Sequence, residues 1–265
     1  MTESERAALS HIRQVVDSVI GMPAPPEPLP AGTYASILPV PYVSKPEEAD
    51  DPSANDSGAM AGVMLVRAYT DNDITPIDFY RQAGQSDKNP LSFTQILNAL
   101  SVNGIPMELR SNLKLADLSL ILFSGRPVIA PVKLAVLKQA GLTLETFNGP
   151  YYVVVVGMDV KQVFIHISLR KDASGEAQDV PWLLFYQAWS QAQGYERAVL
   201  VPRQQLVRRV RVTTRLLNIH EQPDDSTRLV GKASLGELFE VIRQKNGWGK
   251  IGQDRWIYLS STTDI

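Results

Sequence analysis

The sequence predicts an α+β domain followed by a small all-β barrel. Stretches with the apolar spacing of helices precede stretches rich in valine and isoleucine: 57–69, 76–82, 92–102 and 115–123 come before 127–132, 151–158 and 162–168. Helices that come before a run of strands are typical of α+β domains. After residue 207, short apolar segments alternate with turn residues at close intervals, which predicts a barrel of roughly sixty residues.

The opening segment, residues 1–20, is predicted to form an amphipathic helix. Ala8, Ile12, Val15 and Val19 recur at helical spacing within 4–20. Two interpretations stand: the helix packs on its own domain, or it docks on a partner protein. Residues 21–36 follow as a proline-rich tether, with five prolines in the stretch 21–30.

The central domain is predicted to span 37–202 and the C-terminal domain 207–265. The helix at 92–102 carries Phe93, Ile96 and Leu100 on one face and stops at Asn103-Gly104. The strands at 151–158 and 162–168 are separated by three residues, so we expect a hairpin. The change of pattern around residues 200–208 sets the boundary between the two domains.

Composition excludes several classes of protein. With 265 residues, 44% hydrophobic, the chain can fill folded cores, and its net charge of −2 argues against a general nucleic-acid-binding role. There is no cysteine, hence no disulfide, thiolate metal site or cysteine nucleophile. The histidines at 11, 166 and 220 are too scattered for a metal site. We expect no metal and no cofactor.

No stretch is long and apolar enough for a membrane span, and the first residues do not resemble a secretory signal. Localisation therefore stays open between the cytoplasm and a phage or secreted particle. The sequence sets neither the ligand nor the oligomeric state.

Ser57 stands at a chemically special place, the start of a predicted helix. Asn55, Asp56 and Ser57 are capping-type residues followed by an apolar run. Backbone N–H groups and the positive end of the helix dipole meet at such a start, so a nucleophile or an anion is favoured there. The alternative is that Ser57 is only the helix N-cap.

Four motifs resemble, in order and spacing, the papain-fold peptidases of the bacteriocin-processing (double-glycine leader) peptidase-like family over residues 37–200. They are Val40-Pro41-Tyr42-Val43-Ser44, Asn55-Asp56-Ser57-Gly58, Gly125-Arg126-Pro127-Val128-Ile129, and 153–157 followed by Asp159. The resemblance implies a papain-like fold. It also implies a cysteine nucleophile at the helix start, a histidine base before the long valine strand, an aspartate after the next strand, and an upstream glutamine as oxyanion donor.

Each of those catalytic positions holds a different residue in this chain. Ser57 replaces the cysteine, Tyr151 the histidine (with Tyr152 as the alternative register), Lys45 the glutamine, Ala59 the proline after the glycine, and either His166 or Ile167 the aspartate. The resemblance therefore implies a degenerate member of the family, a pseudoenzyme.

The chemistry of the replacements supports the same interpretation. A serine needs a positioned general base, and Tyr151, with a reference pKa of about 10, is a poor one. Lys45 is flanked by acidic residues that keep it charged. His166 is the conventional base that remains, although the alignment puts it behind Tyr151. The alternatives are a hydrolase with Ser57 activated by Lys45 or His166, and an engineered serine in place of a native cysteine.

The C-terminal stretch 209–261 resembles the bacterial SH3-like domains. The motifs are Leu217-Asn218-Ile219-His220, Leu229-Val230-Gly231, Gly236-Glu237, Asn246-Gly247-Trp248-Gly249-Lys250-Ile251 and Trp256-Ile257-Tyr258-Leu259. This resemblance implies binding of peptidoglycan peptides or of proteins. The usual Arg-Ser-Gly-Pro turn of the family reads His220-Glu221-Gln222-Pro223 here, which puts a generic wall-binding groove in doubt.

Aromatic residues are the candidate binding residues: Trp248, Trp256 and Tyr258 in the barrel, and Tyr151 and Tyr152 at the old active site. The alternative for Trp248 is a place in the barrel core. Alternation puts Trp256 and Tyr258 on one face, where we expect both to be exposed, and Ile257 and Leu259 on the other.

The sequence contains one basic cluster, which is interpreted as a solvated linker or as a surface for an acidic partner. It consists of Arg203, Arg208, Arg209, Arg211 and Arg215.

Taken together, the residues predict a non-catalytic binding or structural module. It would recognise a peptide, peptidoglycan or a protein partner in a bacterial envelope or phage-type assembly. The competing hypothesis is an active peptidase or peptidoglycan hydrolase.

Overall fold

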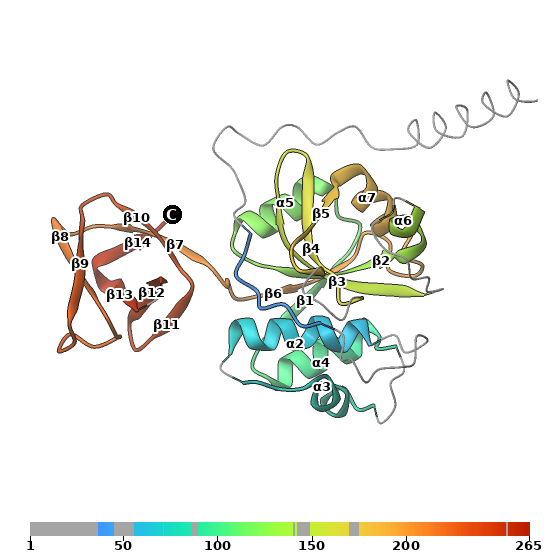
Figure 1. Cartoon of the computed structure of the whole chain (residues 1–265), viewed down its shortest axis with the longest axis horizontal. Coiled ribbons are helices and arrows are strands. Elements are labelled where there is room, and N and C mark those ends of the chain that lie inside the picture. Colours follow the sequence, from blue (N-terminus) through green and yellow to red (C-terminus); the bar gives the residue numbers. More distant parts are fainter. Residues whose placement is uncertain are drawn as a thin grey trace, which may run out of the picture.

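The computed structural model describes residues 37–44, 56–70, 72–85, 90–139, 141, 149–169, 175–252 and 254–265. The predicted helix at 4–20, the tether at 21–36 and Lys45 lie outside these residues. Within them the chain is a mixed helix and sheet protein with a second, separate β unit (Figure 1).

A six-stranded antiparallel sheet forms the centre of the first unit. Its strands are β1 Met107–Arg110, β2 Val128–Lys133, β3 Pro150–Met158, β4 Gln162–His166, β5 Gln178–Pro181 and β6 Val199–Pro202. They lie in the order β1-β6-β2-β3-β4-β5. Every residue of β3 after Pro150 is buried, as its unbroken apolar sequence predicts. The hairpin of β3 and β4 confirms the predicted pairing.

Helices cover both faces of this sheet (Figure 1). On one side lie α2 Ser57–Tyr69, α3 Pro76–Gln82 and α4 Phe93–Val102; on the other lie α5 Leu115–Phe123, α6 Leu134–Gln139 and α7 Trp182–Ser190. Thr75 and Ser92 begin α3 and α4 through capping boxes with Asp78 and Gln95. The predicted helices at 57–69, 76–82, 92–102 and 115–123 are confirmed to within a residue.

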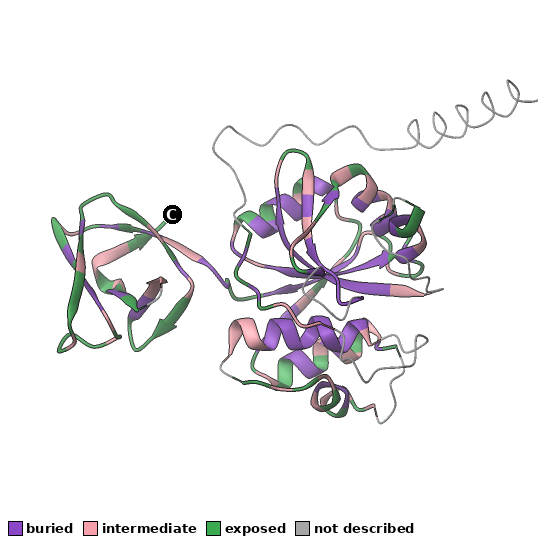
Figure 2. Ribbon diagram, viewed as in Figure 1, coloured by how far each residue is buried: buried purple, intermediate pink, exposed green. Residues whose placement is uncertain are grey.

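The C-terminal β unit, residues 208–264, consists of two antiparallel sheets. One contains β7 Arg208–Val212, β10 Leu238–Val241 and β14 Thr262–Asp264; the other contains β8 Leu216–His220, β9 Leu229–Ser234, β11 Arg243–Lys245, β12 Trp248–Gly252 and β13 Arg255–Tyr258, with a short 3-10 helix at Leu259–Ser261. Both sheets contribute to a small core of their own, which includes Val210, Ile219 and Ile257. Figure 2 shows the contrast: the strands of the first unit are mostly buried, whereas those of the β unit are largely exposed.

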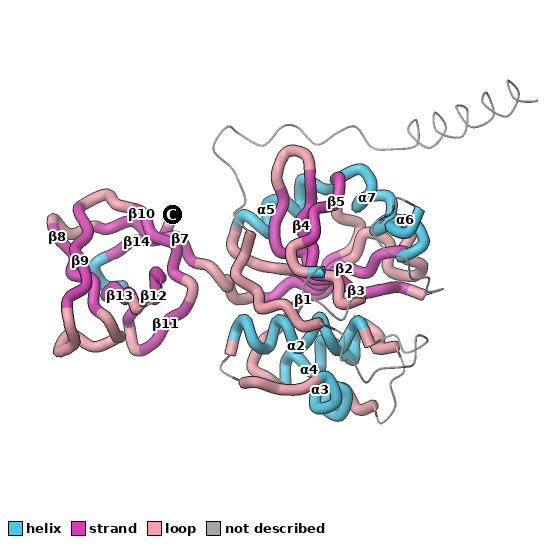
Figure 3. The backbone as a smooth tube through the Cα atoms, viewed as in Figure 1, coloured by secondary structure: helices cyan, strands magenta, loops and turns pink. Residues whose placement is uncertain are grey.

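A short linker after β6 joins the two units (Figure 3). Leu206 and Val207 belong to the core of the first unit. Their backbone N–H groups donate to the Gly125 carbonyl oxygen at 2.8 and 3.2 Å. Gly125 has φ +78°, and a Cβ atom there would lie 1.9 Å from the Val207 carbonyl oxygen. Only glycine therefore allows the linker to approach this closely.

The interpretation of the arginine cluster as a solvated linker is wrong for Arg208 and Arg209. Arg208 donates to Asp264 Oδ2 at 2.9 Å. Arg209 donates to Glu240 Oε1 at 3.1 Å and to the carbonyl oxygen of Phe123 at 3.2 Å, and its guanidinium lies 4.6 Å from the centre of the Phe123 ring. Arg209 thus caps the carboxyl end of α5 from the other unit.

Candidate functional site

Ser57 is the first residue of α2 and has an exposed fraction of 0%. Its Oγ accepts a hydrogen bond of 3.0 Å from the backbone N–H of Tyr152 on β3. The N-cap position belongs to Asp56, which makes no side-chain capping bond. The interpretation of Ser57 as the helix N-cap is therefore wrong, because its side chain joins the helix to the central strand instead.

The start of α2 is tightly packed. A Cβ atom on Gly58 would lie 3.0 Å from Ile96 Cδ1 and 3.3 Å from both Leu91 Cβ and Tyr152 Cδ2. Such distances are shorter than ordinary van der Waals contact, so the glycine lets α2 approach α4 and β3.

Tyr151 and Tyr152 are both buried and, as neighbours on a strand, point to opposite faces of the sheet. The Tyr151 hydroxyl lies 3.3 Å from Ser168 Oγ. The Tyr152 ring packs 5.4 Å from the Phe93 ring, centre to centre. Burial, and then interaction with Tyr195, raises the pKa of Tyr152 above its ordinary value, so this phenol stays protonated.

Ser168 is a residue that sequence reasoning missed. The aligned position of the orienting acid was either His166 or Ile167, one or two residues earlier. The register of β3 and β4 contains an irregularity between Val155 and Gly157, which shifts the pairing by one residue. The hydroxyl pair of Tyr151 and Ser168 joins β3 to the segment that follows β4.

His166 is 2% exposed and uses both of its ring nitrogens in hydrogen bonds to the backbone. Its Nδ1 accepts from the Ala177 N–H at 2.8 Å, so Nε2 carries the proton and donates to the Val40 carbonyl oxygen at 2.8 Å. Burial lowers the pKa of His166, against a smaller opposite effect of Val40 and Glu176. The ring is a neutral cross-link between segment 37–44 and the sheet. It forms no pair with Ser57.

A group of side chains on the outer side of the β unit, here termed the aromatic face, consists of His220, Trp248, Lys250, Trp256 and Tyr258. The strand registers pair Trp248 with Tyr258, Lys250 with Trp256, and Trp256 with His220, so all five share one side. The Trp248 ring lies 5.1 Å from that of His220 and 5.3 Å from that of Tyr258. Ile257 and Ile219 point to the core on the opposite side.

Exposure differs among these aromatic residues. Tyr258 is 45% exposed, whereas Trp256 is 8% exposed, so the expectation that both are exposed is wrong for Trp256. The Lys250 ammonium lies 5.9 Å from the centre of the Trp256 ring and helps to cover it. Trp248 is buried as well, yet it contacts His220 and Tyr258 and is not part of the β-unit core.

No cluster of three or more metal-ligating side chains occurs among the residues that the structure describes. Within the same residues, none of the helices combines the length and apolarity that crossing a membrane requires.

No protein-family model matches the chain, and no curated protein matches its sequence. Solved structures similar to it include a putative C39-like peptidase from Bacillus anthracis, with 17% identity and a TM-score of 0.44 over 64% of this chain and 98% of that chain. The peptidase domain of Streptococcus ComA, a bi-functional ABC transporter involved in a quorum sensing pathway, has 14% identity and a TM-score of 0.42 over 64% and 100%.

A third similar structure is NlpC2 from Trichomonas vaginalis, with 10% identity and a TM-score of 0.20 over 52% of this chain and 43% of that chain. Identities and TM-scores as low as these three assign neither an activity nor a ligand to this chain.

Proposed function

We propose that this protein is a non-catalytic recognition module, in which a peptidase-like α+β unit serves as a scaffold and the β unit binds a peptide or a protein partner. The observation that carries the first half of the proposal is the environment of Ser57. Its side chain is fully buried and accepts a backbone hydrogen bond from β3. A nucleophilic serine must instead face both a general base and the carbonyl group of a substrate.

The described side chains that were considered as a base for Ser57 are poor ones. His166 is held by two backbone groups, and the Tyr151 hydroxyl lies beside another hydroxyl, that of Ser168. With a reference pKa of about 10, a phenol keeps its proton at neutral pH and accepts one poorly from a serine. These replacements favour the pseudoenzyme over the active hydrolase.

Labelling with a fluorophosphonate tests this half of the proposal in solution. We expect intact-mass analysis of the full chain to show no adduct that is lost in the Ser57→Ala variant. Stoichiometric modification of Ser57 would overturn the proposal, because only an activated serine reacts with this probe.

A second test asks whether the site can be rebuilt. The double variant Ser57→Cys, Tyr151→His restores the nucleophile and the imidazole that the resemblance implies. We expect no cleavage of a double-glycine leader peptide, because a described partner of the side chain at position 151 is the Ser168 hydroxyl, which supports an imidazolium less well than a carboxylate does. Robust cleavage would show that the scaffold still positions a catalytic pair.

The binding half of the proposal rests on the aromatic face. Tyr258 offers an exposed ring on a rigid strand, with Trp248 behind it and the ammonium of Lys250 nearby. Rings held in this way suit contact with a peptide at a low cost in side-chain entropy. The resemblance of this unit to bacterial SH3-like domains adds peptidoglycan stem peptides to the candidate ligands.

The partners of the whole chain are inferred by analogy, because the chain combines a peptidase-like unit with a unit that resembles SH3-like domains. We infer that the protein is part of an envelope or phage-type assembly. The segment 4–20 would be a second docking element, and the two domains would span 37–202 and 207–265.

Pull-down with immobilised full chain should capture a partner or soluble muropeptides, and Tyr258→Ala should weaken capture. Unchanged capture by Tyr258→Ala would remove the aromatic face from the proposal.

A further inference from the structure

The hairpin of β11 and β12 turns through two exposed residues, Asn246 and Gly247. Their φ angles are positive, 50° and 83°, as a two-residue type I′ turn requires. The turn adjoins the aromatic face: Trp248 follows Gly247, and a Cβ atom on Gly247 would lie 3.3 Å from Tyr258 Cε2. The Gly247 carbonyl oxygen also accepts a hydrogen bond of 2.8 Å from the Leu259 N–H. A chemical change in this turn would therefore reach residues of the aromatic face.

An asparagine that precedes a glycine carries the groups for its own modification. The Gly247 backbone nitrogen attacks Cγ of the Asn246 side chain; an N–Cγ bond forms, the Cγ–Nδ2 bond breaks, and ammonia leaves with the proton of the attacking nitrogen. Water then opens the cyclic succinimide at one of its two carbonyl groups, which gives aspartate or isoaspartate. Glycine favours this reaction, because a residue without a Cβ atom hinders neither the approach nor the backbone rotation that it needs. Water is the only co-reactant.

Another Asn-Gly pair, Asn103-Gly104, follows α4 and is held in place. Nδ2 of Asn103, the leaving group of the reaction, donates to Gln82 Oε1 at 2.6 Å and to the Ala99 carbonyl oxygen at 2.8 Å. The Gly104 N–H, which belongs to the attacking nitrogen, donates to the Ser101 carbonyl oxygen at 3.0 Å. Attack in this pair requires all three hydrogen bonds to break first.

The pair in the β unit lacks these restraints. Within the described part of the chain, neither the Asn246 side-chain amide nor the Gly247 N–H forms a hydrogen bond. Attack still requires rotation about the Asn246 Cα–C bond, away from the turn conformation, so the turn must open. Exposed hairpin tips open locally at a much smaller free energy than the whole domain does. The same chemical sequence, Asn-Gly, is therefore protected at one place and accessible at the other.

We propose that Asn246 is a self-modification site, which deamidates spontaneously and whose isoaspartate product displaces the aromatic face. Isoaspartate adds one carbon atom to the main chain, and a two-residue turn does not accommodate it. The pairing of Lys245 with Trp248, which closes the turn, is then lost, and the Trp248 ring leaves its place 5.3 Å from the Tyr258 ring. Aspartate, the other product, keeps the turn, because Asp-Gly also favours type I′. This inference does not rest on the ligand of the aromatic face.

Ageing of the full chain at pH 7 and at pH 9 tests the reaction. Peptide mapping by mass spectrometry gives the deamidated fraction of each asparagine, including Asn148, which precedes Gly149 and lies outside the described residues. We expect Asn246 to react at least about tenfold faster than Asn103, whose amide must first leave two hydrogen bonds. The rate should rise at pH 9, because the attacking nitrogen loses its proton. A rate at Asn246 no higher than at Asn103 would overturn the proposal.

A matched variant tests the effect on the aromatic face. Asn246→Gly removes the reactive amide and keeps the turn, because Gly-Gly is also favoured in type I′ turns. In ¹⁵N–¹H NMR of the aged wild type, we expect a second Trp248 indole signal that grows with the isoaspartate content measured by isoaspartate methyltransferase labelling. Aged Asn246→Gly and fresh Asn246→Asp should each show one Trp248 signal. A single unchanged signal in wild type that contains isoaspartate, or an equal change in aged Asn246→Gly, would contradict the proposed effect.

Discussion

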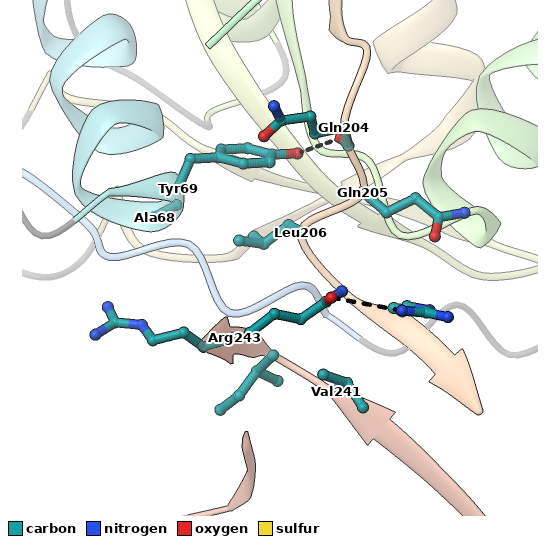
Figure 4. Close-up of a pocket in the computed structure, with 10 residues that line it drawn as sticks. Ala68, Tyr69, Gln204, Gln205, Leu206, Val241 and Arg243 are labelled. Atoms are coloured by element: carbon teal, nitrogen blue, oxygen red, sulfur yellow. Dashed lines mark hydrogen bonds between the residues drawn. The ribbon is translucent and has the colours of Figure 1, made fainter. Parts of the chain in front are cut away.

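The two ends of helix α2 are used in opposite ways. At the amino end, Ser57 is fully buried, its Oγ accepts a hydrogen bond from Tyr152, and Gly58 leaves no room between α2, α4 and β3. At the carboxyl end, Ala68 and Tyr69 line an open pocket between the units (Figure 4). Buried polar groups at the amino end form hydrogen bonds with one another and so stabilise the fold. The polar groups that line the pocket at the carboxyl end include exposed side chains.

The largest expected effect comes from the linker that shapes the carboxyl-end pocket. Gly125→Ala should lower the free energy of unfolding by about 3 kcal/mol or more, because the added Cβ would overlap the Val207 carbonyl oxygen and the backbone at φ +78° disfavours alanine. Urea denaturation of the full chain measures this loss.

Gly104→Ala is the matched control. Gly104 has nearly the same φ, +77°, but no atom lies within 4 Å of the place where its Cβ would stand. We expect a loss of only about 1 to 2 kcal/mol, from the backbone conformation alone. Equal losses in the two variants would show that contact between Gly125 and the linker does not hold the units together.

An intermediate effect is expected at the amino end of α2. Ser57→Ala removes the acceptor of the Tyr152 N–H and leaves that group buried without this partner, which should cost about 2 kcal/mol. Ser101→Ala, an exposed position on α4, should change stability by less than about 0.5 kcal/mol. If both variants unfold at the same urea concentration, the bond to β3 contributes nothing and the contrast between the two ends of α2 is lost.

The smallest effect concerns pH. Burial lowers the pKa of His166 in the folded state below the unfolded value of about 6.5. The unfolded chain therefore takes up this proton first, so the contribution of His166 to stability is complete above that pH and declines as pH falls through it towards the folded value.

Unfolding free energies measured from pH 7 to pH 5 test this linkage. We expect a steeper decline for the wild type than for His166→Gln, whose amide can replace the two backbone hydrogen bonds without titrating in this range. Identical slopes would show that the imidazole is not held neutral by its surroundings.

Local features of the sequence predicted much of the fold. The helices at 57–69, 76–82, 92–102 and 115–123 and the β3–β4 hairpin follow from apolar periodicity, capping residues and short turns, which act between residues close in the chain. The short strands β1 and β5 were missed because each has only four residues and includes exposed positions.

The candidate sites were harder to predict, because they depend on contacts between distant parts of the chain. The bond between Ser57 and Tyr152 spans 95 residues, and the contact of His166 with Val40 spans 126. The pocket requires the two units to be placed against each other by Gly125 and Arg209. Burial of Trp256 under Lys250 likewise depends on strand register, which alternation alone does not fix.

The contact between Gly125 and the linker also bears on how the chain folds during synthesis. Leu206 and Val207 lie beyond β6, the last strand of the first sheet, yet they fill part of that unit's core. Domains generally fold as units while the chain emerges from the ribosome. A nascent chain released only as far as residue 202 would lack these two side chains and the two N–H groups that bond to Gly125. The first unit completes its core only when residue 207 has emerged, which is also where the second unit begins.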